Sequence, residues 1–152
     1  MAGQQRRTGT AHRPVSSTRP RPLLQRADRL LMEAAGEDDP SERFLSAYLA
    51  ALRGAAAVLA ATEATRPARE RSRNAWVLMS RAAPEFVMWS DYFAEHSSTR
   101  AALEAGISRE VTDRQADDFF SRVGAFLHDV EDLVGDQARI PDSGDWHKNI
   151  SA

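Results

Sequence analysis

A long apolar seam near the end of the chain constrains the fold more than any other feature. Apolar side chains recur there at intervals of three, four and seven residues between Thr112 and Val134. This period is typical of an amphipathic helix that must bury one face against protein. The seam consists of Ala116, Phe119, Phe120, Val123, Phe126, Leu127, Val130, Leu133 and Val134.

Four more helices are expected upstream, because apolar residues repeat at helical spacing and no segment alternates as a strand does. Their expected ranges are about 22–35, 40–62, 67–81 and 84–95. The fourth can continue, with a kink near Ser97-Ser98, as far as Ala105. The sequence therefore predicts an all-α fold, an antiparallel bundle of four to five helices.

Local signals mark where these helices begin and end. Asp39-Pro40 favours a start, since Asp accepts hydrogen bonds from the first turn and Pro has no N–H to leave unpaired there. Thr112-x-x-Gln115 fits a capping box, and Gly36 and Gly135 are expected to end the first and last helices. Gly54, which precedes three Ala, is expected to let a neighbouring helix approach closely.

Charge divides the chain into a basic arm and an acidic body. Residues 1–22 hold five Arg and no acidic residue, and the whole chain carries −2, so residues 23–152 carry −7. Residues 1–21 show no apolar period and are predicted to be disordered. Residues 22–135 are expected to form one helical domain, and residues 136–152 a flexible tail in which Trp146 offers a docking point.

Composition excludes several classes of protein. The chain has no Cys, which rules out disulfides, thiolate zinc sites and Cys nucleophiles. The longest apolar run, Ala55–Ala61, is shorter than the roughly 20 residues that span a bilayer, and residues 1–22 lack the apolar core of a signal peptide. We therefore expect a cytoplasmic protein without membrane contact. His128 and Asp132 stand four residues apart, a spacing that can place two ligands on one metal, but no second His lies at a helpful spacing, so no metal and no other cofactor is expected.

Two groups of side chains have both a functional and a structural interpretation. Arg66, Arg69 and Arg73 share one face of the expected third helix and, with the basic arm, could follow a nucleic-acid backbone. We favour the alternative, a solvated face that pairs with acidic residues near Asp39, because the body is net acidic. An aromatic string could line a ligand pocket, although rings at helical spacing more often form core. Its members are Trp76, Phe86, Trp89, Tyr92 and Phe93.

The spacing Arg122-x5-His128 is the only arrangement in the sequence that suggests chemistry. Six residues on a regular helix correspond to about 600° of rotation, so the two side chains lie about 120° apart around the axis. Each also has a local partner four residues away, Asp118 for Arg122 and Asp132 for His128. An Arg and a His from two chains could still meet across a two-fold axis, where His moves protons and Arg holds a phosphate.

Two segments carry a resemblance to a known family. They are Trp76-Val77-Leu78 … Ala83-Pro84-Glu85-Phe86 … Trp89 … Tyr92-Phe93 and Thr112-x-Arg114-x-Ala116-Asp117-Asp118. Together with the helix to Val134, these segments resemble small actinobacterial HEPN proteins, named for a nucleotide-binding domain of higher eukaryotes and prokaryotes. The resemblance covers about residues 23–135. It implies a bundle of four to five helices that commonly dimerises.

The resemblance also implies an activity to test. Many HEPN proteins are metal-independent RNases whose motif is an Arg, a spacer of four to six residues and a His on a late helix. Arg122 and His128 match that motif, so the resemblance assigns His128 to acid/base chemistry or to the ribose hydroxyl, and Arg122 to the scissile phosphate. Many active members have a polar residue after the Arg, where this chain has Val123.

Two hypotheses therefore stay open. In the first, the chain is a non-catalytic HEPN-like module that forms a homodimer through the wide apolar face of its fifth helix and binds RNA or a protein partner. In the second, it is a metal-independent RNase whose site combines Arg122 and His128 of both chains.

Overall fold

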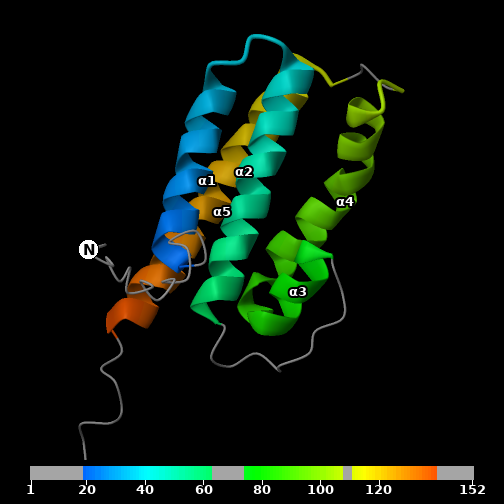
Figure 1. Ribbon diagram of the computed structural model, residues 1–152. Coiled ribbons are helices and arrows are strands. Elements are labelled where there is room, and N and C mark those ends of the chain that lie inside the picture. The colour runs from blue at the N-terminus through cyan, green and yellow to red at the C-terminus, as the bar shows by residue number, and fades with distance from the viewer. Residues whose placement is uncertain (1–18, 63–73, 108–110, 140–152) are drawn as a thin grey trace, which may run out of the picture.

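The structure is an all-α bundle, as the sequence predicts. The computed structural model describes residues 19–62, 74–107 and 111–139. Over these ranges the chain forms five α-helices, one short 3-10 helix and no strand (Figure 1). They are α1 (Pro20–Ala35), α2 (Pro40–Ala61), α3 (Ala75–Ala82), the 3-10 helix η3 (Pro84–Phe86), α4 (Val87–Glu104) and α5 (Asp113–Arg139).

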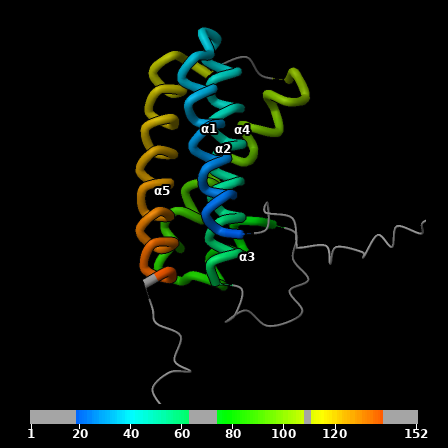
Figure 2. The backbone as a smooth tube through the Cα atoms, turned by 60° about the vertical axis from the view of Figure 1, so that its left-hand side comes forward, coloured from blue at the N-terminus to red at the C-terminus, as the bar shows by residue number. Residues whose placement is uncertain are grey.

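The helix α2 is the centre of the bundle. It packs against α1 and α5 along its length and against α3 and α4 on another side. Both views show α1, α2 and α5 side by side, with α1 and α4 running opposite to α2 and α5 (Figures 1 and 2). The chain direction therefore alternates in the order α1, α2, α4, α5, which is the antiparallel bundle that the sequence predicts.

The apolar seam of α5 lies in the core of a single chain. Phe119, Val123, Phe126 and Val130 are each at most 2% exposed. At Gly54 on α2 an added Cβ would lie 2.6 Å from Cδ2 of Leu127 and 2.8 Å from the ring of Phe126. The expected close approach at Gly54 is thus present, and the neighbour is α5.

Most of the aromatic string is core, as we expected. Trp76, Phe86 and Phe93 are buried, and the rings of Trp76 and Phe93 stack with centroids 4.7 Å apart. The indole Nε1 of Trp76 donates to the hydroxyl of Tyr48 at 2.8 Å, which satisfies a polar atom inside the core. Only Trp89 and Tyr92 are half-buried, so they are the members of the string that can face a cavity.

Several helix ends confirm the sequence signals. Asp39 caps α2 by accepting from the backbone N–H of Glu42 at 3.0 Å. The capping box at α5 is reciprocal, since Thr112 Oγ1 accepts from Gln115 N at 3.1 Å and Gln115 Oε1 accepts from Thr112 N at 3.0 Å. The helix α4 ends just before Gly106, whose φ of 70° is left-handed, and runs unbroken through Ser97 and Ser98.

Other helix ends differ from the prediction. Gly135 does not end α5, which continues to Arg139, because glycine permits a helix end but does not impose one. The helix α3 begins at Ala75, since the side chain of Asn74 caps it by accepting from the backbone N–H groups of Trp76 and Val77. The first turn after Pro84 is a 3-10 turn, so α4 itself begins at Val87.

The first helix also begins earlier than expected. It starts at Pro20, because Pro20 and Pro22 lie in a first turn where a missing N–H is tolerated. The remaining arm, the stripe of Arg66, Arg69 and Arg73, and Trp146 all lie outside the described residues. The predictions for them stay predictions.

The composition of α2 follows from its central place. This helix is long and apolar enough to cross a membrane by length and hydropathy alone, but half of its most apolar window is buried in the bundle. A helix that packs on several sides needs apolar residues on several sides, which accounts for the composition without a bilayer.

Candidate functional site

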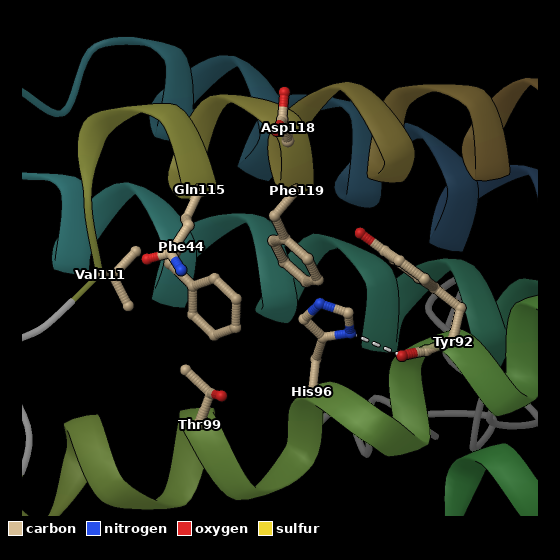
Figure 3. Close-up of a pocket in the computed structure, with 8 residues that line it drawn as sticks. All are labelled: Phe44, Tyr92, His96, Thr99, Val111, Gln115, Asp118 and Phe119. Atoms are coloured by element: carbon tan, nitrogen blue, oxygen red, sulfur yellow. Dashed lines mark hydrogen bonds between the residues drawn. The ribbon is translucent and has the colours of Figure 1, made fainter.

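A pocket of about 340 Å³ opens between α4 and the first turns of α5 (Figure 3). Its volume lies at the lower end of the roughly 300–1,000 Å³ that is usual for small-molecule sites. The helix α2 contributes one aromatic ring to it. The lining residues are Phe44, Tyr92, His96, Thr99, Val111, Gln115, Asp118 and Phe119.

His96 lies among three of the aromatic rings of this pocket. Its ring centroid is 4.4 Å from that of Tyr92, 5.2 Å from Phe119 and 6.3 Å from Phe44. Its Nδ1 lies 2.7 Å from the backbone carbonyl oxygen of Tyr92, one helical turn earlier. Because a carbonyl oxygen only accepts, Nδ1 must carry a proton and donate it. In the neutral ring Nε2 is then an acceptor, and it points away from that bond toward α5 (Figure 3).

Two charged side chains of α5 affect the phenol of Tyr92, which lines the pocket. Burial raises the pKa of the Tyr92 phenol above its ordinary value, the positive charge of Arg122 lowers it, and the negative charge of Asp118 raises it. Arg122 is therefore close enough to act on this phenol, on the α4 side of α5. The carboxylate of Asp118 is exposed and turned away from His96 in Figure 3.

The capping box positions one more polar group. Because Oε1 of Gln115 accepts from the backbone of Thr112, the amide NH₂ of Gln115 is left for the pocket and lies near the ring of Phe44 (Figure 3). Thr99 of α4 is opposite, on the other wall. The capping box thus has two effects: it satisfies backbone N–H groups at the start of α5, and it orients the amide NH₂ of Gln115.

Arg122 and His128 do not meet within one chain. Arg122 acts on Tyr92 of α4, and on the same side of α5 Asp129 accepts from Nε1 of Trp89 at 2.9 Å. His128 stands one turn after Gly124, where an added Cβ would lie 3.8 Å from Leu31 of α1. The two side chains thus lie about 120° apart around α5, Arg122 toward α4 and His128 toward α1, as the helical rotation predicts.

Both side chains are exposed, and the expected local pairs are absent. Among the described residues, Arg122 forms no ion pair with Asp118 and His128 forms none with Asp132. The expectation of surface pairing is therefore wrong for these positions. The i, i+4 spacing permits such a pair but contributes too little free energy to require it.

Arg43 holds the start of α5 against the turn between α1 and α2. Its Nη1 lies 2.9 Å from Oδ1 of Asp117 and 3.5 Å from Oδ1 of Asp113. Its Nε and Nη2 donate to the carbonyl oxygens of Glu37 and Asp38, each at 3.1 Å. This contact fixes the end of α5 that supplies Gln115 and Asp118 to the pocket.

Sequence reasoning missed His96. Its position continues the aromatic string by one turn from Tyr92, which is a signal that the sequence contains. Its neighbours Phe44 and Phe119 come from other helices, so only the fold brings the pocket together. In the described parts of the chain no group of three or more His, Cys, Asp or Glu is arranged to hold a metal ion.

Comparison with known proteins gives one result. A family model, SAV_6107-like HEPN, matches residues 34–131, which is more than half of the 152-residue chain. No curated protein and no solved structure matches. The matched range includes the whole of the pocket and both Arg122 and His128.

Proposed function

This chain belongs to the SAV_6107-like HEPN family, and from that premise we propose that it is a non-catalytic interaction module that forms a homodimer and engages an RNA or protein partner. The separation of Arg122 and His128 carries the proposal. A nucleophilic or acid/base site holds its groups within hydrogen-bond reach of one another or of an orienting group. Within one chain the two side chains do not meet, and among the described residues neither forms an ion pair.

The homodimer needs a surface other than the apolar face of α5. That face is buried in one chain, so the apolar seam no longer supports an interface. The outer face of α5 remains, and Ala125 is exposed at its centre, three residues from Arg122 and three from His128. A small residue there lets two helices approach closely, and we place the two-fold axis of the dimer at Ala125.

A two-fold axis at Ala125 would also permit a second candidate, a metal-independent RNase. Two antiparallel copies of α5 related by a two-fold axis at Ala125 bring Arg122 of each chain opposite His128 of the other. In one chain these residues are about 9 Å apart along the helix axis. The pairing would supply an acid/base and a phosphate-binding cation twice in each dimer.

One experiment separates the two candidates. Wild-type protein and the His128→Ala variant are incubated with end-labelled single-stranded RNA in excess EDTA, beside a mock preparation from cells without the gene. We expect no cleavage above the mock preparation from either protein. Cleavage by wild type that is lost in His128→Ala would overturn the proposal and establish the RNase.

A further inference from the structure

The pocket between α4 and α5 has features that the proposed function does not use. From them we infer that it binds a small, neutral heteroaromatic molecule, whose ring packs against the aromatic side chains and whose N–H donates to Nε2 of His96. This site lies within one chain, so it depends neither on the dimer nor on Arg122 and His128 acting together.

Tyr92 and His96 are the half-buried rings that line the pocket, and the core residues Phe44 and Phe119 line it with the small part of their rings that stays exposed. Phe44 and Phe119 pack with centroids 4.3 Å apart at an interplanar angle of 32°, and Tyr92 lies nearly parallel to Phe119, at 20° and 6.1 Å. A flat ring in the pocket can therefore stack on the half-buried ring of Tyr92 in an offset arrangement.

His96 determines which edge of the ligand is recognised. The bond from Nδ1 to the carbonyl of Tyr92 fixes the tautomer, so neutral His96 presents an acceptor at Nε2. No described residue donates to Nε2. A ligand that brings an N–H satisfies this acceptor, and a ligand without one leaves it unpaired beside apolar rings.

Two walls of the pocket also carry polar side chains. Gln115 of α5 and Thr99 of α4 lie on opposite walls of the pocket (Figure 3). They allow a second polar atom on the ligand but do not demand a charge. The charged groups nearby, Asp118 and Arg122, are of opposite sign and both exposed. The interior therefore favours a neutral molecule over an ion.

Indole is the probe for a direct test. It carries a flat ring and one N–H, and 1-methylindole differs from it by the loss of that donor. The binding of each is followed by chemical-shift perturbation in ¹H–¹⁵N and imidazole spectra of the full chain. We expect the shifts to centre on His96 and Phe119, with indole binding wild type about 3–10-fold more tightly than 1-methylindole does, the range that one net hydrogen bond gives.

His96→Asn tests the assignment of the acceptor. Asn can still donate to the carbonyl of Tyr92, but it has no acceptor at the position of Nε2. We expect the preference for indole over 1-methylindole to disappear in this variant, while His128→Asn, a change of the same type on an exposed surface, keeps it. Shifts centred elsewhere, or an equal affinity of wild type for both probes, would overturn the inference even if His96→Asn failed to fold.

Discussion

At the scale of single residues, two glycines that both lie inside helices have opposite roles in this chain. Gly54 lies where α2 and α5 leave no room for a side chain, and the atoms that a Cβ would meet belong to buried Leu127 and Phe126. Gly135 lies inside α5 with nothing within 4 Å of an added Cβ. The sequence alone correctly predicts the close helix approach at Gly54 but wrongly predicts a helix end at Gly135, because a glycine in a sequence does not reveal which side chains will pack beside it.

The substitution Gly54→Ala should therefore lower the free energy of unfolding by about 1–3 kcal/mol, since two well-packed side chains must move. Gly135→Ala is the matched control and should raise the free energy of unfolding by about 0.5–1 kcal/mol, because alanine is the better helix former. Urea denaturation followed by circular dichroism measures both. If the two variants shift in the same direction, the packing of α2 against α5 at Gly54 is not as described.

At the scale of helices, the ends with a specific polar signal were predictable. Asp39 and the pair Thr112 and Gln115 have side chains that match a capping geometry, and the structure forms those hydrogen bonds. The start of α3 was not predicted: the sequence favours a start near residue 67, whereas the helix begins at Ala75 with Asn74 as its cap. His96 was not predicted for a different reason, since its role depends on rings from two other helices.

The contacts of Arg43 join two of these elements, the turn after α1 and the first turns of α5. Arg43→Met keeps much of the apolar stem but removes the guanidinium, and we expect the free energy of unfolding to fall by about 1 kcal/mol. The estimate is modest because Asp113 and Asp117 are mostly exposed, at 76% and 67%.

The control for Arg43→Met is Glu104→Gln, which removes the exposed pair with Arg100 at 3.1 Å. We expect it to cost about 0.5 kcal/mol or less. Thermal unfolding of both variants at low and high salt gives the comparison. An equal, small effect of both would mean that Arg43 does not anchor α5.

At the scale of the whole molecule, the apolar residues of α5 pack into the core of one chain, so they are not available for an interface between two chains. The seam that dominates the sequence accounts for the fold, and for that reason it does not identify a partner. Any association of two copies through α5 must use its outer, largely polar face. This face has less apolar area than the buried face, so a dimer that uses it is more sensitive to one introduced charge.

In the homodimer that we propose, Ala125→Glu should therefore give a monomer, because two like charges would face each other at the two-fold axis. Light scattering after gel filtration measures the mass. The control is Met88→Glu, which places the same charge on a residue 81% exposed at the start of α4, and it should leave the dimer intact. A wild-type monomer would contradict the homodimer itself, and a monomeric Met88→Glu with a dimeric Ala125→Glu would move the interface to α4.

The central position of α2 has a consequence for how the chain is made. The helix is complete in the sequence at Ala61, but α5, which covers one of its apolar sides, ends at Arg139. At the usual rate of synthesis this separation corresponds to roughly 4–15 s during which that side of α2 has no cover from its own chain. A nascent chain stalled before α5 is thus expected to be held by chaperones or to aggregate.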